Sequence, residues 1–149
     1  MSKTLASVVL SLLITAAFMV AADSLFTGTW KLNVEKSKFD PGPPTQSETV
    51  TIQPDGKVSV EEVNGAGQSE SWSYTPSEGT PATITGLPDS TVVEKKVGDR
   101  NIEHTWKMGE SNMTGHGVLS KDGKKMTYTL RGKNGKGQPI HNVLIFEKQ

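Results

Sequence analysis

Short segments in which apolar and polar residues alternate recur along the chain, and this repetition restricts the fold more than any other feature. After Ala22 no helical periodicity continues for more than two turns. The alternating segments instead follow one another roughly every ten residues, separated by turn-forming residues, which indicates a β-sandwich or β-barrel. We expect nine or ten strands, and the candidate segments are residues 26–34, 48–53, 57–63, 68–75, 82–85, 90–97, 100–108, 112–120, 124–131 and 139–147.

The connections between these segments favour antiparallel neighbours. A parallel crossover needs about a dozen residues and usually a helix. The only longer link, residues 35–46, contains Pro41, Pro43 and Pro44, which argue against a helix. The fold class predicted is therefore all-β, an antiparallel up-and-down meander closed into a small barrel of about 8–10 strands. Such a barrel has room for side chains and one small ligand.

The first alternating segment, FTGTWKLNV, places Phe26, Gly28, Trp30 and Leu32 on one face. Trp30 would supply a large apolar body whose indole N–H needs a partner. Gly28 would let a bulky neighbour come close. We therefore expect this strand to close the barrel, with Trp30 at one end.

Residues 1–22 have the order of a secretory signal peptide. Lys3 precedes an uncharged apolar run, and the small residues Ala21 and Ala22 come before Asp23. A membrane anchor is the alternative, although a run of 18 residues is near the lower limit for spanning. We predict cleavage after Ala22, a single barrel domain over residues 23–149, and a secreted or periplasmic location.

The composition excludes several classes of function. The chain has no Cys, which rules out thiol catalysis, thiolate metal sites and a lipid-anchored form. Cleavage after Ala22 would leave 15 basic and 16 acidic residues, a formal charge of −1. Such a balance does not attract nucleic acid or an anionic membrane. We expect neither as a partner after signal cleavage, and we predict no metal and no cofactor.

The segment FTGTWKL resembles the first strand of the calycins, which include the lipocalins, with their Gly-x-Trp strand, and the intracellular fatty-acid-binding proteins. More closely, the chain resembles small exported lipocalin-like proteins of bacteria, whose function is uncharacterised. Further matching pieces span most of the chain, at residues 28–33, 36–39, 41–44, 120–124, 137–139, 142–143 and 146–149. The resemblance implies a calycin-like barrel that binds a small apolar molecule, without specifying which one.

The chain also departs from these relatives. Fatty-acid-binding proteins carry an Arg-x-Tyr pair on the last strand that holds the ligand carboxylate. Alignment on Glu147 puts Leu144 and Phe146 at those positions, so the clamp is missing here. Residues 35–46 are too short and too Pro-rich for the helical lid of those proteins, and the chain ends in a strand where lipocalins often have a helix.

Inward-facing aromatic and polar residues are the candidates for ligand binding. We predict that the interior is lined by His104, Tyr128, Trp106, Met126, Trp72 and Trp30. His104 shares a strand face with Ile102 and Trp106, so it is a hydrogen-bonded interior histidine, a ligand contact or an axial haem ligand. The same aromatic residues could pack the barrel solid, because a filled core and a cavity wall use the same physics.

No catalytic constellation is found in the sequence. The three histidines lie on different predicted strands, and no serine lies in a Gly-x-Ser-x-Gly motif. Glu62 and Glu70 share parity with inward residues, either as a buried catalytic pair or as solvated strand ends. We therefore predict no catalytic residues and expect that the protein is not an enzyme.

Two main hypotheses follow for the function. The first is an exported, monomeric binding protein for a small hydrophobic ligand held in the barrel interior. The second is a structural or interaction module, an envelope-stress or inhibitor-type protein with a filled barrel. A cavity of several hundred Å³ bordered by His104 and Tyr128 would favour the first.

Overall fold

The computed structural model describes residues 24–149. The predicted signal peptide, residues 1–22, lies outside the described residues. The described part contains ten strands and no helix: β1 (Gly28–Leu32), β2 (Ser47–Ile52), β3 (Val58–Val63), β4 (Ser69–Tyr74), β5 (Ala82–Thr83), β6 (Ser90–Val97), β7 (Asn101–Met108), β8 (Ser111–Leu119), β9 (Lys125–Lys133) and β10 (Pro139–Lys148). Within residues 24–149 there is accordingly no helix with the length and hydropathy to cross a membrane.

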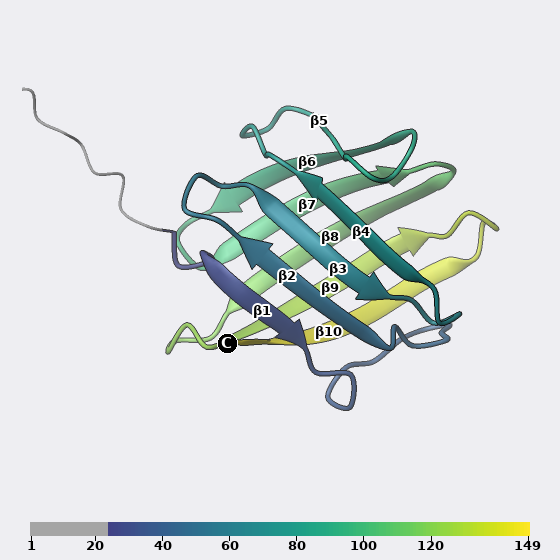
Figure 1. The fold of residues 1–149 in the computed structure, drawn as a ribbon, viewed down its shortest axis with the longest axis horizontal. Coiled ribbons are helices and arrows are strands. Elements are labelled where there is room, and N and C mark those ends of the chain that lie inside the picture. Colours follow the sequence, from purple (N-terminus) through teal and green to yellow (C-terminus); the bar gives the residue numbers. More distant parts are fainter. Residues whose placement is uncertain (1–23) are drawn as a thin grey trace, which may run out of the picture.

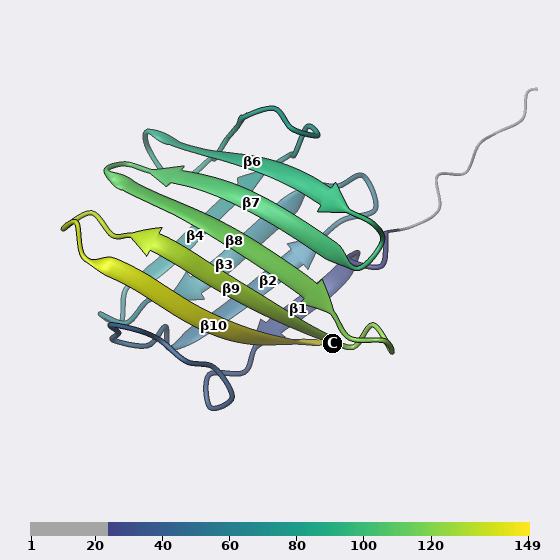
Figure 2. The same cartoon turned by 180° about the vertical axis from the view of Figure 1, so that it is seen from behind.

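The ten strands form one antiparallel sheet in the order β4-β3-β2-β1-β10-β9-β8-β7-β6-β5. Each strand pairs with its neighbour in sequence, except that β1 also pairs with β10 and β4 does not pair with β5 as a strand. The sheet curls so that β1–β4 lie in front of β6–β10 in Figure 1, and Figure 2 shows the same two layers from behind. The predicted all-β, up-and-down, calycin-like barrel is therefore confirmed.

The barrel is nearly closed between its two edge strands. Ser73 at the end of β4 and Thr85 after β5 exchange two backbone hydrogen bonds, of 2.9 and 2.8 Å. This single bridge joins the edges where a full strand ladder would otherwise be needed. It reduces the exposed edge, which unpaired β-strands must otherwise protect from association.

The first strand is shorter than the alternation predicts. The chain turns before it, with the Thr27 amide donating to the Ser24 carbonyl, and Gly28 has a φ of +134°. After Leu32 the backbone turns again, so Val34 does not continue the strand. Phe26 is still buried because the preceding turn folds it against the barrel core.

Trp30 lies at the centre of the core below β1. Its side chain is fully buried, and its indole N–H donates to the Phe26 carbonyl over 2.8 Å. The Lys148 ammonium lies 5.3 Å from the centre of the ring, within the range for a cation–π contact. The surrounding apolar cluster comes from the region of β1 and from β7–β10: Phe26, Leu32, Ile102, Leu119, Met126, Leu144 and Phe146.

Residues 33–46 cross one end of the barrel as an extended strap. Lys38 forms a bridge with Val143 of β10, and the Asp40 amide donates to the side chain of Asn142. Farther along, Thr45 donates its hydroxyl to Glu62 of β3. The strap therefore joins β10 to β3, and it contains no helix, as its prolines predict.

Truncation of Trp30 tests its role in closing the barrel. We expect Trp30→Ala to lower the free energy of unfolding by about 3–5 kcal/mol, because it removes a fully buried aromatic side chain. Trp30→Phe keeps most of the apolar volume but loses the hydrogen bond to Phe26, so we expect a loss of about 1–2 kcal/mol. Urea denaturation measures both values, and equal stability of Trp30→Ala and wild type would contradict this role.

Candidate functional site

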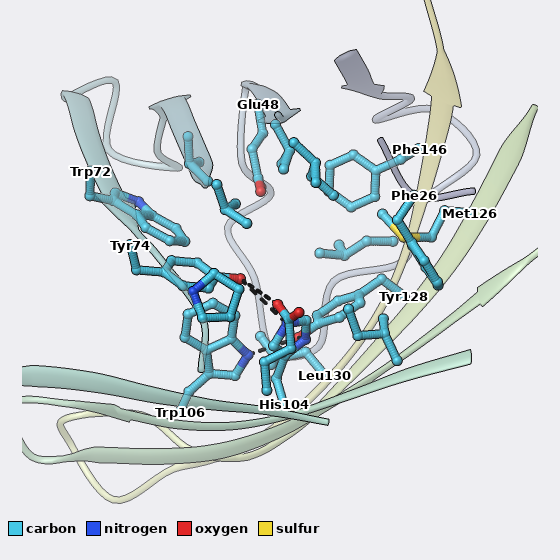
Figure 3. Close-up of a pocket in the computed structure, with 18 of the residues that line it drawn as sticks. Phe26, Glu48, Trp72, Tyr74, His104, Trp106, Met126, Tyr128, Leu130 and Phe146 are labelled. Carbon is cyan, nitrogen blue, oxygen red and sulfur yellow. Dashed lines mark hydrogen bonds and ion pairs between the residues drawn. The ribbon is translucent and has the colours of Figure 1, made fainter. Parts of the chain in front are cut away.

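A cavity of about 340 Å³ lies inside the barrel. Its wall is formed by the inward faces of β2, β3, β4 and β6–β10, together with the strap. Figure 3 shows aromatic and aliphatic side chains converging on it from both layers of the sheet. Its volume lies at the lower end of the range of small-molecule sites.

One wall of the cavity is a cluster of three aromatic rings. The rings of Trp72 and Tyr74 from β4 stack with centres 6.2 Å apart. Trp106 from β7 meets both rings edge-on, at 5.7 Å from each. These separations are typical of favourable aromatic pairs, so the wall is fixed in place and does not depend on a ligand for its shape.

A polar network lies beside these rings. His104 on β7 is directly opposite Glu94 on β6, and its Nε2 lies 3.1 Å from the Glu94 carboxylate. The Nδ1 atom lies 3.1 Å from the hydroxyl of Tyr128 on β9, and the Trp106 indole N–H donates to that same hydroxyl over 2.7 Å. Tyr74 reaches the Glu94 carboxylate at 3.5 Å. The dashed lines in Figure 3 trace these contacts.

The protons of the network can be assigned from its donors and acceptors. The Tyr128 oxygen accepts from Trp106, so its O–H is available to His104 Nδ1. Nε2–H then donates to Glu94, which also accepts from Tyr74. In this arrangement every polar member of the network has a partner. Both nitrogens of His104 are engaged, so an axial haem bond would have to break one of these contacts.

Two glycines of β8 make room for Tyr128. Gly115 lies opposite His104, and a Cβ there would overlap the Tyr128 hydroxyl. A Cβ on Gly117 would come within 2.8 Å of Ile102 and 3.2 Å of the Tyr128 ring. The Tyr128 side chain therefore lies flat over the β8 backbone, which brings its hydroxyl to His104. His116, between the two glycines, is on the outer face and exposed.

Two further carboxylates face the cavity near the strap. Glu48 on β2 and Glu62 on β3 are cross-strand partners, and both line the cavity. Glu62 accepts a hydrogen bond from Thr45, whereas Glu48 has no hydrogen bond or ion pair with any of residues 24–149. Figure 3 shows the Glu48 side chain pointing into the cavity from the layer opposite His104.

Burial shifts the ionisation of these groups. Desolvation, with a smaller contribution from Glu62, raises the pKa of Glu48 to about 8. Desolvation also raises the pKa of Glu62, and the nearby Glu70 adds to this, while the Thr45 hydrogen bond opposes it. The pKa of the Tyr74 hydroxyl and that of Tyr128 are both raised, chiefly by burial, so both remain O–H donors.

The structure brings together five of the six residues predicted to line the interior. His104, Tyr128, Trp106, Met126 and Trp72 all line the cavity. Trp30 does not line it, because its side chain is fully buried within the apolar cluster that includes Phe26.

The sequence did not single out Glu94, Glu48 or Tyr74 as site residues. Glu94 and Glu48 both have the parity of inward valines on their own strands, Val92 and Val50, and this is the signal that could have found them. Of the predicted pair Glu62 and Glu70, only Glu62 lines the cavity. Glu70 is exposed and accepts from Asn64, so the two do not form a buried pair.

Solved structures with the same fold include two proteins of low sequence identity. The crystal structure of a variant of the fluorescent protein UnaG has 18% identity, covers 84% of this chain and 96% of its own, and gives a TM-score of 0.53. A DUF3598-family protein of unknown function from Nostoc punctiforme has 18% identity over 84% of this chain, with a TM-score of 0.55. This chain spans 48% of the length of that protein.

At such identities the likeness shows the fold alone. No family model matches the chain, and no curated protein has a matching sequence. The strand order and the two likenesses together define the chain as a small calycin-like β-barrel.

Substitution of Glu48 tests the cost of its burial. A folded pKa near 8, against 4.5 for the ordinary group, means that the folded protein holds this proton more tightly than the unfolded chain. The resulting stability is complete below about pH 4.5 and is lost as the pH rises toward 8. We expect Glu48→Gln to be more stable than wild type by roughly 1–3 kcal/mol at pH 8, after discounting for access of solvent through the cavity.

The matched control is Glu61→Gln, which removes the same charge from the exposed outer face of β3. Urea denaturation between pH 5 and pH 8.5 should show the stability gain of Glu48→Gln shrinking toward acid pH, with no such trend for the control. A gain that does not depend on pH would mean that the Glu48 carboxylate is well solvated.

Proposed function

We propose that this protein is an exported binding protein that holds a small, largely apolar molecule in its barrel. The observation that carries the proposal is the cavity of about 340 Å³ bordered by His104 and Tyr128. A largely apolar wall with a few convergent polar groups is the usual pattern of a small-molecule site. A solid barrel, as the structural or interaction-module hypothesis requires, would not leave this volume.

Binding without catalysis is the activity that the polar groups support. His104 uses both ring nitrogens in contacts with Glu94 and Tyr128, so neither nitrogen is poised toward the cavity as a base. Among the described residues, no group of three or more His, Asp or Glu side chains has the arrangement of a metal site. The wall would instead orient a ligand while its apolar surface is buried, at about 25 cal/mol per Å² before ordering costs.

Export and the remaining partners form part of the same proposal. The order of residues 1–22 supports a cleaved signal, and the charge balance of residues 23–149 supports a protein that works without nucleic acid or membrane, as a monomer. The relation to small exported lipocalin-like proteins rests on the Gly28-Thr29-Trp30 strand and the pieces that match it.

A neutral fluorescent probe tests the binding function. We expect N-phenyl-1-naphthylamine to give a saturable increase in fluorescence with the wild-type barrel. Leu130→Trp would place a bulky indole ring on the cavity wall. It should lower the affinity for the probe by about tenfold or more, because the indole takes up the volume that the probe needs. Fluorescence titration measures both affinities.

The control for this experiment is Thr129→Trp, which adds the same ring to the outer face of β9. This variant should bind the probe as tightly as wild type does. Circular dichroism melts verify that both variants fold. A wild-type protein that shows no saturable binding of any neutral apolar probe would overturn the proposal.

Mass spectrometry tests export. When the full chain is expressed in a bacterial host, we expect protein from the periplasm or medium to have the mass of residues 23–149. An uncleaved chain held in the membrane fraction would favour the anchor alternative.

A further inference from the structure

The polar groups that line the cavity differ in whether another residue of the protein forms a hydrogen bond or ion pair with them. Glu94 contacts His104 and Tyr74, and Glu62 accepts from Thr45. Glu48 makes no hydrogen bond or ion pair with any described residue, although its carboxylate is directed into the cavity. Glu48 is half-buried, so its unpaired carboxylate is free to pair with a partner that enters the cavity.

The charged side chains of the cavity wall indicate whether that partner is a cation or an anion. The described residues that line the cavity include three carboxylates, on Glu48, Glu62 and Glu94. They include one Lys or Arg side chain, Lys96, which is exposed near the far end of β6. Above about pH 8, where Glu48 is ionised, a ligand carboxylate would therefore be repelled in this cavity, whereas an organic cation would be attracted.

The aromatic side chains of the cavity wall also favour a positively charged ligand. Trp72, Tyr74 and Trp106 present their rings to the cavity at one side of Glu48, as Figure 3 shows. Aromatic rings attract ammonium groups through the negative charge of their faces, most strongly where water is excluded. On the other side of Glu48, Phe26, Met126 and Phe146 offer an apolar surface.

We propose that the natural ligand of this barrel is an amphiphilic amine, whose protonated nitrogen pairs with Glu48 beside the rings of Trp72 and Tyr74. Its apolar part lies along Phe26, Met126 and Phe146. This inference rests on the proposed binding function and specifies the class of ligand. Glu48 is then the residue that determines specificity, while the His104 network holds the opposite wall in place.

A matched series of ligands tests the inference. Octylamine, octanol and octanoate share one apolar chain and differ only in the head group. Each is titrated against the barrel loaded with N-phenyl-1-naphthylamine at pH 8.5, and displacement gives its affinity. We expect octylamine to bind about tenfold or more tightly than octanol, and octanoate to bind most weakly.

Glu48→Gln should remove the preference. We expect this variant to bind octylamine about tenfold or more weakly than wild type does, because the charged pair is lost. Its affinity for octanol should change by less than about twofold. Glu61→Gln, on the outer face, should leave both affinities as in wild type, which excludes general attraction of cations to an acidic surface.

The wild-type pH profile gives a second readout that needs no variant. Because the pKa of Glu48 is about 8, pairing with an ammonium requires loss of its proton. Octylamine affinity should therefore rise by about fivefold or more from pH 6.5 to 8.5, while octanol affinity stays nearly constant. The titratable or charged groups that face the same space are Glu62 and, through it, Glu70, with Tyr74, Glu94, His104, Tyr128 and Lys96.

The outcomes separate this inference from the function on which it rests. If the neutral probe binds but octanol or octanoate equals octylamine, or if Glu48→Gln keeps the amine preference, the amine assignment is wrong and the binding function stands. A flat octylamine profile between pH 6.5 and 8.5 also overturns the assignment. If the probe itself does not bind, the proposed function fails first.

Discussion

The hydrogen bond between Tyr128 and His104 links the parts of the structure that shape the cavity. It joins β9 to β7 across β8, and it forms only because Gly115 lets the Tyr128 ring lie on the backbone between them. Through His104 the contact extends to Glu94 on β6, and through Trp106 it extends to the aromatic wall. The interior face of four consecutive strands is thus held by one satisfied network, whose members could not be buried separately without cost.

The polar groups inside the barrel include some with partners in the protein and one carboxylate without. His104 is 8% exposed and Glu94 is 6% exposed, and each has partners within the protein. Glu48, only half-buried, has an unpaired carboxylate and a raised pKa. The sequence left His104 open as a hydrogen-bonded interior histidine, a ligand contact or an axial haem ligand, and both of its ring nitrogens contact residues of the protein. The unpaired carboxylate is on β2, at a position that resembles an ordinary solvated strand end.

The alternation of apolar and polar residues predicted the architecture, because every strand of a closed barrel has one face toward the interior. Trp106 and Met126 share parity with buried neighbours, so their inward direction followed from the pattern alone. The same rule does not say how deep a residue lies along the barrel axis. Trp30 and Trp106 therefore looked equivalent in the sequence, although the first is sealed within the core and the second borders the cavity.

The pairing register of neighbouring strands could not be predicted from the alternation of residues either, as Glu94 shows. A two-residue turn at Gly98 and Asp99 would place Glu94 opposite Glu103, an exposed residue of the outer face. The observed loop contains three residues between Val97 and Asn101, with Gly98 at a φ of +69°. That single added residue sets Glu94 against His104 and creates the buried pair. Turn geometry, which composition specifies only loosely, thus decides which polar groups meet inside the barrel.

The same barrel architecture can therefore select ligands of opposite charge. The fatty-acid-binding proteins, which this chain resembles, hold a carboxylate with an Arg-x-Tyr pair on the last strand. Here Leu144 and Phe146 take those positions and line an apolar side of the cavity, while the inward charges are carboxylates. Since the strand order dictates only that inward residues alternate, a few substitutions on inward positions reverse the polarity of the site without disturbing the sheet. The fold of this protein accounts for the cavity, and Glu48 on β2, Glu62 on β3 and Glu94 on β6 supply the carboxylates of its wall.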